Sequence, residues 1–162
     1  MSDYQKILIA LRKITRAIDL NSKKLVRTSG VTGPQLLVMR VIDREARTKP
    51  SVIAKNVQLS QATVTTILDR LERSGYVRRE RSLTDRRVVE VELTTDGVDK
   101  LRNAPELLQA GFFKKFDALE DWERSLLTSS LQRIALMMDA DDIDASPILE
   151  LGDLAIDNET AR

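Results

Sequence analysis

The stretch SQATVTTILDRLERSGYVRRERSLTDRRVVEVELTTDG, residues 60–97, changes its hydrophobic period once. Apolar residues recur at helical spacing from Val64 to Leu71, and Gly75 is typical of the left-handed residue that follows a helix. After Gly75, the segments YVRRERS and RVVEVEL are strand-like, the second with alternating apolar and acidic residues, and LTDR joins them. The stretch therefore predicts one amphipathic helix followed by a two-stranded hairpin.

The residues before this helix predict two more short helices. Thr32 and Gln35 have the spacing of a capping box, so a helix is expected to begin there. Ser51 is expected to cap the next helix, and Ser60 to cap the helix of the opening stretch after the tight turn QLS. Two short helices joined by a brief turn are typical of a helix-turn-helix, whose second helix can enter a DNA major groove.

Longer helices are expected on both sides. Residues 3–28 carry an apolar stripe at helical spacing, and residues 120–139 carry another. Between them, Thr94 or Thr95 is expected to cap a helix that Pro105 kinks or interrupts. The apolar stripe of residues 3–28 is compatible with packing on the chain's own core or on a second subunit.

The composition excludes several classes of function. Cysteine and histidine are absent from the 162 residues, which excludes disulfides, catalysis by either residue and the usual zinc sites. The glycines form no phosphate-binding loop, and there is no serine elbow. We therefore expect no enzyme activity, no cofactor and no metal. Without a long apolar run or a signal peptide, a cytoplasmic protein with no membrane contact is expected.

The charge is distributed unevenly. Eight acidic residues and one arginine give residues 139–162 a net charge of −7, so residues 1–138 carry +8. A basic body is typical of proteins that bind nucleic acid, although many basic proteins do not. The spacing of the tail acids does not fit a calcium loop, because Ile143 and Asp144 replace the expected ligand and glycine. Solvated disorder is one interpretation of the tail; docking of its apolar residues on the body is our hypothesis, and these residues are Ile148, Leu149, Leu151 and Leu154.

The face of the second helix opposite its apolar residues suits contact with DNA. Ala62, Thr63 and Thr66 are small, so the helix can approach closely, and their methyl groups can meet thymine methyls. A solvated polar face is the alternative interpretation. The expected DNA-binding residues of the two helices are Ser51, Ser60, Gln61, Ala62, Thr63, Thr65, Thr66, Arg70 and Arg73.

The hairpin tip carries Asp85, Arg86 and Arg87. A ribbon with arginines at its tip can insert a side chain into a narrow minor groove, where the negative potential is concentrated. We expect Asp85 to pair with the guanidinium of Arg87 and to orient it. The alternative is an ordinary solvated turn.

The motifs TGPQLLVMRVI, SQATVTTILDRLERSGYVRR and DRRVVEVELTTDG resemble the multiple-antibiotic-resistance regulator (MarR) family of winged helix-turn-helix repressors. The last fits the family wing pattern through Asp85, Arg87, Leu93, Thr94 and Gly97. The resemblance covers roughly residues 5–138 and implies a homodimer that binds double-stranded DNA at a pseudo-palindrome. It also implies a dimer interface formed by Ile7, Leu11, Ile14, Ile18, Leu127, Leu131, Ile134 and Met138.

Two positions depart from the family pattern. Gln58 stands where many relatives have glycine in the helix-turn-helix turn, and Thr66 stands where many have arginine. The second departure removes a strong contact, so specificity is expected to depend more on the neighbouring polar residues of that helix. A finer similarity, in SSLQR and the tail DADDIDASPIL among others, is to the subgroup that represses ectoine and other compatible-solute genes. It implies osmotic control.

Together these features predict a mainly α fold with a small β wing. The expected organisation is an N-terminal dimerisation helix at 1–30, a winged helix-turn-helix domain at 31–97, C-terminal dimerisation helices at 98–139 and an acidic tail at 140–162. The small-molecule effector is unknown, and the sequence shows no site for the anionic aromatic ligands of some relatives. Two other classes remain open: a helical protein that contacts another protein, and an enzyme that uses carboxylates alone.

Overall fold

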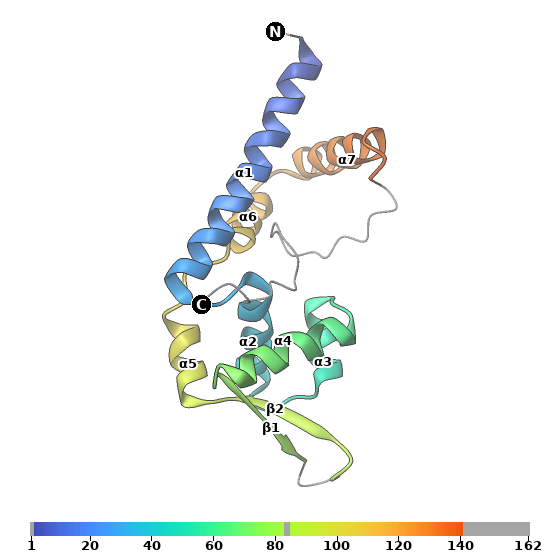
Figure 1. Ribbon diagram of the computed structural model, residues 1–162. Helices are drawn as coiled ribbons and strands as arrows, with labels where there is room; N and C mark the ends of the chain where they lie inside the picture. The colour runs from blue at the N-terminus through green and yellow to red at the C-terminus, as the bar shows by residue number, and fades with distance from the viewer. Residues whose placement is uncertain (1, 83–84, 141–162) are drawn as a thin grey trace. The chain divides into compact units, whose positions relative to one another are not determined.

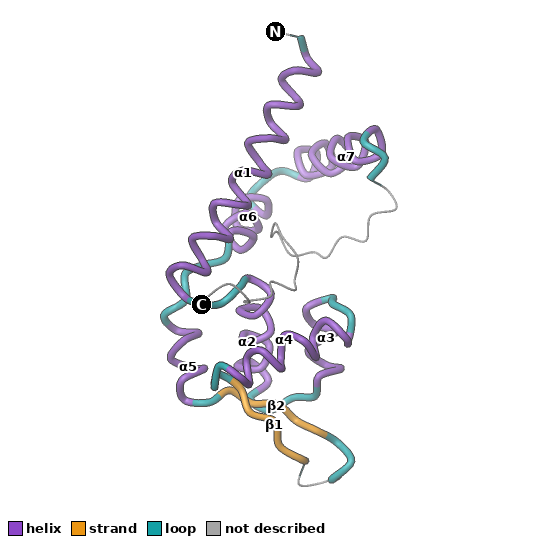
Figure 2. Tube along the Cα trace, in the orientation of Figure 1, coloured by secondary structure: helices purple, strands orange, loops and turns teal. Residues whose placement is uncertain are grey.

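The computed structural model describes residues 2–82 and 85–140. They form two compact units, residues 2–105 and residues 106–140. The described part is mainly helical, with one two-stranded antiparallel sheet, which confirms the expected fold class (Figures 1 and 2). The proposed docking residues of the acidic tail lie outside the described residues.

The first unit begins with one long helix, α1 (Asp3–Ser29). It ends at Gly30, whose φ of 70° is left-handed and whose N–H reaches the carbonyl of Val26. Within α1 only Leu25 and Ser29 are buried. Most of the amphipathic stripe of this helix is therefore not covered by the other described residues of the first unit.

Three short helices form the core of the first unit: α2 (Gly33–Glu45), α3 (Pro50–Val57) and α4 (Gln61–Arg73). The expected capping box opens α2, because the Thr32 side chain accepts from the N–H of Gln35 and the Gln35 side chain accepts from the N–H of Thr32. The side chains that fill the space between these helices have 1% exposure or less, and they are Leu36, Met39, Ile42, Ile53, Val64, Leu68 and Leu71.

The expectation that Ser51 caps α3 is wrong. Lys49 is the N-cap and Pro50 occupies the first turn, which places Ser51 one residue inside the helix. Proline is favoured there because it lacks a backbone N–H, and an N–H at this position would have no acceptor within the helix. Ser51 is exposed at this end of α3.

Gln58 makes the turn between α3 and α4 without glycine. It has φ 55° and ψ 41°, in the left-handed region, and the following Leu59 N–H bonds to the Ala54 carbonyl at 3.1 Å. A residue with a Cβ is strained in this conformation by about 1 kcal/mol. The turn between the two helices is thus made by a glutamine in a left-handed conformation.

The chain leaves α4 through a glycine turn and enters the wing. Gly75 has φ 75°, and the N–H groups of Gly75 and Tyr76 bond to the carbonyls of Glu72 and Leu71. This closes the helix as a Schellman motif. The hairpin β1 (Val77–Arg81) and β2 (Val89–Leu93) follows, with Val77 opposite Leu93.

One connection in the wing was not predicted from the sequence. Thr48, in the α2–α3 connection, pairs with Val91 of β2 through two backbone hydrogen bonds of 3.1 and 2.7 Å. Both residues are buried. The hairpin is therefore attached to the helical core along its inner strand, as well as through its two ends.

After the wing, α5 (Thr95–Arg102) is capped by Thr94, whose hydroxyl accepts from the N–H of Gly97 at 3.0 Å and donates to the Gly75 carbonyl at 2.6 Å. As predicted, Pro105 lies in an interruption. The second unit then contains α6 (Leu108–Asp117) and α7 (Asp121–Met137). In α6, the rings of Phe112 and Phe116 stack at 5.5 Å between centroids.

We predict that Gly97→Ala destabilises the protein by about 3 kcal/mol. A Cβ at Gly97 would lie 2.0 Å from the Tyr76 carbonyl oxygen, and that oxygen is held by the Thr94 N–H at 3.0 Å. Urea denaturation measures the change in the free energy of unfolding. Thr95→Ala, at an exposed position of the same helical turn, is the control and should change it by less than about 0.5 kcal/mol. An unchanged midpoint for Gly97→Ala would contradict this packing.

Candidate nucleic-acid interface

The orientation of α4 is set by its buried face. Val64, Ile67, Leu68 and Leu71 are all at most 3% exposed. At 100° per residue, the positions directly opposite these four are Ala62, Thr66, Asp69 and Arg73. Of these, Ala62, Thr66 and Arg73 are exposed and Asp69 is half-buried. The outward face that the sequence predicts is therefore the one that the packing presents.

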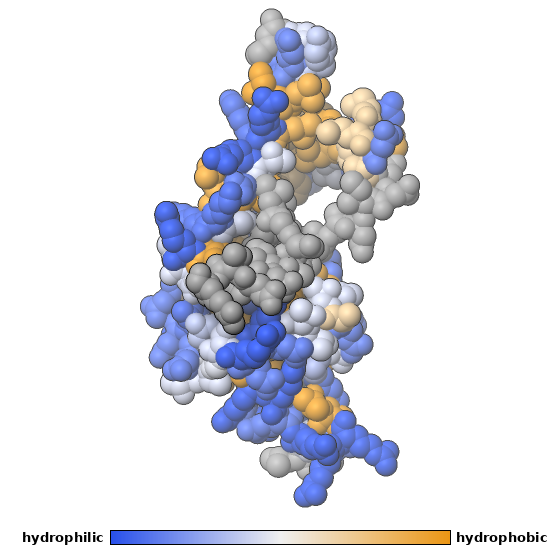
Figure 3. Space-filling view, viewed as in Figure 1, coloured by the Kyte–Doolittle hydropathy of each residue, from blue (hydrophilic) through white to orange (hydrophobic). Residues whose placement is uncertain are grey.

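The N-terminus of α4 is capped as expected. The Ser60 hydroxyl accepts from the Thr63 N–H at 3.1 Å, and the Ser60 and Thr63 hydroxyls are 2.7 Å apart. Ser60 and Gln61 are exposed beside this cap, whereas Thr63 is half-buried. We define the winged lobe as residues 31–102. It brings these positions together with Ala62 and Thr66. Figure 3 shows that the visible face of the lobe is mainly hydrophilic.

Arg79 of β1 connects the wing to α4, a contact that was not predicted from the sequence. Its guanidinium lies 2.6 Å from the Asp69 carboxylate and 3.0 Å from the Glu72 carboxylate, and it also reaches the Thr65 carbonyl at 3.4 Å. Asp69 points outward on the face that would meet DNA, where a bare carboxylate repels phosphates. Arg79 neutralises it. An acid pair at i and i+3 followed by a basic strand is the signal that would have indicated this contact.

A second arginine, Arg47, holds the opposite side of the wing. It lies 2.6 Å from Glu80 and 3.1 Å from Glu92, while Glu80 and Glu90 are directly opposed across the hairpin. Arg78 also donates to Glu92. The hydrogen bond from Arg47 lowers the pKa of the Glu92 carboxyl, and the same bond raises the pKa of Arg47. Arg47 thus offsets the like-charge repulsion between Glu80 and Glu90, which destabilises the pairing of the two strands.

The wing tip differs from the expectation in one contact. Asp85 accepts a hydrogen bond from the backbone N–H of Arg87 at 3.0 Å, and its carbonyl accepts from Val88 at 2.9 Å. No ion pair joins Asp85 to the Arg87 guanidinium among the described residues. The carboxylate therefore shapes the turn through the main chain, and the exposed side chains of Arg86 and Arg87 extend from it.

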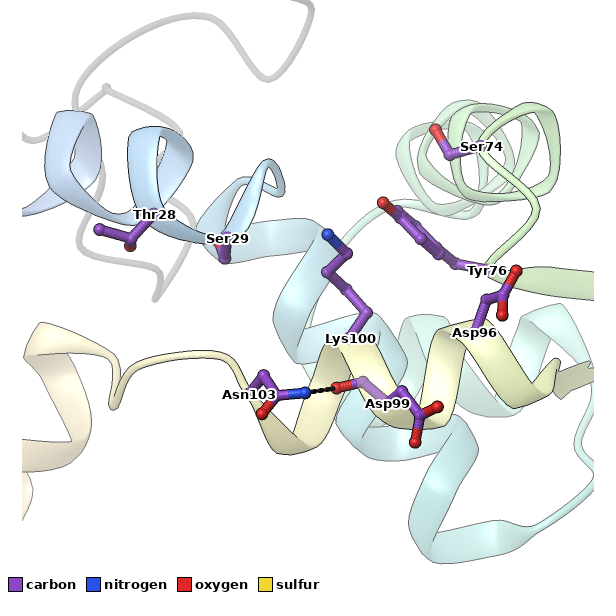
Figure 4. Close-up of a pocket in the computed structure, with 8 residues that line it drawn as sticks. All are labelled: Thr28, Ser29, Ser74, Tyr76, Asp96, Asp99, Lys100 and Asn103. Carbon is purple, nitrogen blue, oxygen red and sulfur yellow. Dashed lines mark hydrogen bonds between the residues drawn. The ribbon is translucent and has the colours of Figure 1, made fainter.

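A polar pocket of about 500 Å³ lies in the first unit, and Figure 4 shows its lining. The Lys100 ammonium lies 5.1 Å from the centroid of the Tyr76 ring, and Asn103 donates to the Asp99 carbonyl at 2.8 Å. Asp96 also lines the pocket, together with Thr28, Ser29 and Ser74. Two carboxylates beside one lysine make the pocket a poor site for an anion. Lys24 and Arg27, two cations in the last turns of α1, do not line it.

The expected dimer residues retain apolar exposure. Ile7, Ile14, Leu127, Leu131 and Met138 are between 41% and 58% exposed. The remaining three, Leu11, Ile18 and Ile134, are half-buried. Exposed apolar residues gathered on one helix, as on each of α1 and α7, favour association with another protein surface.

Other kinds of site have little support in the described part of the chain. It contains no group of three or more acidic residues placed to hold a metal ion. None of its helices has the length and apolar character needed to cross a bilayer.

Comparison with known proteins identifies similar folds and sequences. Residues 31–89 match the model of the MarR family. The chain is 30% identical over 119 residues to the uncharacterized HTH-type transcriptional regulator YfiV of Bacillus subtilis, which covers 74% of this chain and 72% of YfiV. It is 31% identical over 97 residues to the HTH-type transcriptional repressor MdtR of Bacillus subtilis, covering 60% of this chain and 61%, less than two thirds, of MdtR.

Solved structures give the same result for the fold. The structure of Streptococcus pneumoniae FabT in complex with DNA has a TM-score of 0.50 and 28% sequence identity, and the match covers 85% of this chain and 98% of FabT. FabT is thus similar to this chain over almost its whole length.

We predict that Arg79→Gln weakens binding to duplex DNA by about tenfold. The substitution leaves the carboxylates of Asp69 and Glu72 unpaired on and beside the outward face of α4, where they repel phosphates. Electrophoretic mobility shift at fixed salt measures the change. Adding Asp69→Asn and Glu72→Gln to Arg79→Gln should restore most of the affinity. Equal affinities for the single and triple variants would contradict the neutralising role.

Proposed function

The chain belongs to the MarR family of winged-helix transcriptional regulators, and from this premise we propose that it is a dimeric repressor that binds a pseudo-palindromic DNA operator. In each subunit α4 enters the major groove, and the tip of the hairpin enters the adjacent minor groove. The observation that carries the proposal is that one lobe presents the small exposed residues of α4 and the exposed arginines 86 and 87 of the wing. FabT, a similar protein, has been solved in complex with DNA.

The α4 contact follows from the chemistry of its exposed end. Gln61, Ala62 and Thr66 occupy the first turns, which are the part of a recognition helix that reaches base edges. Thr63, Thr65 and Arg70 flank them, and Arg73 lies further along the same face. Ser51 and Ser60, each exposed near the start of a helix, contact phosphates with the help of free backbone N–H groups.

The wing contact follows from the geometry of the tip. Because Asp85 is engaged with the main chain, the guanidinium groups of Arg86 and Arg87 extend from the turn. A narrow A·T-rich minor groove attracts such groups through its enhanced negative potential. Arg47 and Arg79 hold the hairpin against the core and α4, so the distance between wing tip and helix is defined before DNA binds.

Dimerisation supplies the second half-site. The apolar stripe on α1 and the exposed apolar residues of α7 form the proposed interface, comprising Ile7, Leu11, Ile14, Ile18, Leu127, Leu131, Ile134 and Met138. A two-fold axis through such an interface places two copies of α4 in successive major grooves, about 34 Å apart. The operator is therefore expected to be a pseudo-palindrome.

We further propose that the regulated genes serve compatible-solute synthesis or uptake and that osmolarity sets the response. The support is the similarity of SSLQR and the tail sequence to repressors of ectoine genes, together with the +8 charge of residues 1–138. DNA binding through phosphate contacts weakens as salt rises. Binding releases counterions from the DNA, and this release is less favourable when the salt concentration in solution is higher. A rise in cytoplasmic potassium would then relieve repression without an organic ligand.

Release by a small molecule is the second candidate for the signal. The pocket beside Tyr76 and Lys100 supports it, because a ring and a cation lie within 5.1 Å of each other. Asp96 and Asp99 favour a neutral or zwitterionic compound over the anionic aromatics. In this alternative, the ligand would act on the junction between α1 and α5.

Selection of bound fragments from genomic DNA tests the proposal directly. The purified full-length protein should enrich a pseudo-palindrome upstream of compatible-solute genes. Enrichment upstream of other genes would retain the DNA-binding repressor and remove the osmotic role. If no duplex is enriched, the chain is instead a helical interaction protein that contacts another protein.

We predict that Arg87→Ala lowers operator affinity about tenfold and reduces the slope of log affinity against log salt by about 1. The wild-type protein should lose roughly 10³-fold in affinity between 50 and 200 mM potassium glutamate if it makes about six phosphate contacts. Fluorescence anisotropy across that titration measures both quantities.

The control for this titration is Arg102→Ala, an exposed cation at the end of α5 and outside the proposed interface. It should leave both the affinity and the slope unchanged. A wild-type affinity that stays constant across the titration would rule out direct sensing of ionic strength.

A further inference from the structure

The threonine hydroxyls on α4 donate to the helix itself. The Thr65 hydroxyl donates to the Gln61 carbonyl at 2.8 Å, and the Thr66 hydroxyl donates to the Ala62 carbonyl at 3.1 Å. Both side chains are exposed to solvent. Their hydroxyl protons are nevertheless directed at the backbone. Each hydroxyl has a single proton to donate. On this face, therefore, neither threonine offers a hydrogen-bond donor to a base.

This arrangement leaves methyl groups as the outward chemistry of the N-terminal half of α4. Ala62 and Thr66 are one helical turn apart and both exposed, and each contributes one methyl group to the same strip of surface. The Thr63 hydroxyl lies 2.7 Å from that of Ser60, at the cap. The strip between Gln61 and Asp69 is thus apolar at its centre.

One cation beside this strip is engaged by acids. Arg79 is held by the carboxylates of Asp69 and Glu72, while Arg73, two turns further along the helix, donates through Nε to the Asp69 carbonyl at 3.3 Å. Guanine presents only acceptors in the major groove, whereas thymine presents a methyl group beside one acceptor. The strip formed by Ala62 and Thr66, whose hydroxyl proton is directed at the backbone, matches the thymine edge better than the guanine edge.

We propose that Ala62 and Thr66 recognise the C5-methyl groups of thymines in the major groove, so that the operator is selected by methyl contact under the first two turns of α4. The proposal rests on the proposed function, because it requires α4 to lie in the major groove. It makes Thr66 a residue that determines specificity through its methyl group. The arginine that many relatives carry at this position would select differently.

Deoxyuridine substitution tests the role of the thymine methyl. The full-length protein is first used to select a bound duplex from a randomised DNA library. In this duplex, each thymine is then replaced in turn by deoxyuridine. Each replacement beneath α4 should weaken binding about fourfold, the value of one buried methyl group. Replacements outside the protected footprint of α4 should have no effect.

Two variants of Thr66 separate the methyl group from the hydroxyl. Thr66→Val keeps the methyl group and removes the hydroxyl, so it should bind within about twofold of the wild type and keep the penalty for deoxyuridine. Thr66→Ser keeps the hydroxyl and removes the methyl group, so it should bind the thymine probe about fourfold more weakly. With Thr66→Ser, replacing the facing thymine should cost nothing further, because the contact is already lost. Thermal unfolding of each variant checks that the fold is intact.

The outcomes distinguish this inference from the proposed function. If deoxyuridine binds as well as thymine at every position, methyl recognition is overturned while DNA binding stands. If Thr66→Ser binds normally and Thr66→Val does not, the hydroxyl is the recognition element and the inference is equally overturned. If the library yields no bound duplex at all, the proposed function fails and the inference fails with it.

Discussion

The burial of one face of α4 is the constraint on which the rest of the protein depends. Val64, Ile67, Leu68 and Leu71 contribute about 2 kcal/mol each when buried, and together they outweigh the exposed ion pairs around the helix, which are worth less than about 1 kcal/mol each. The packing therefore sets the rotation of α4. The ion pairs form in whatever places that rotation leaves for them.

Two arginines then neutralise the acidic side chains of α4 and of the wing. Arg79 engages the carboxylates on the flank of α4, and Arg47 engages those of the hairpin, where Glu80 and Glu90 face each other. Neither pair adds much stability at an exposed site. Their effect is on geometry and charge: the wing is held against both the core and α4, and the outward face of α4 is relieved of a bare carboxylate. The basic tip of the wing carries Arg86 and Arg87, which form no ion pair with the residues that the structure describes.

This division of roles links the fold to the proposed mode of binding. In the proposed mode of binding, the wing would supply affinity that depends on salt, because its arginines would contact a polyanion. The first turns of α4 would supply discrimination that depends little on salt, because methyl contacts involve no counterions. A regulator built in this way can lose operator occupancy as ionic strength rises while keeping its preference among sequences.

The sequence by itself determined the features that depend on residues three or four apart. Three local features were predictable: the capping box of Thr32 and Gln35, the cap at Ser60 and the left-handed Gly75. The first two are hydrogen bonds between near neighbours, and the third is a backbone conformation that favours glycine. The cap at Ser51 was predicted wrongly, since proline at the first helical position places the N-cap of α3 at Lys49, two residues earlier. Such errors are small because local chemistry offers few alternatives.

Only the tertiary structure decided the contacts between distant residues. The pairing of Thr48 with Val91 and the contact of Arg47 with Glu92, which lies 45 residues away, follow from how the elements pack. The hydrogen-bond partner of Asp85 could not be predicted from the sequence either. Arg87 has both a backbone N–H and a guanidinium that can donate to the carboxylate, and in the folded turn the backbone N–H does so. A sequence shows which donors exist, whereas packing and backbone geometry decide which acceptors they meet.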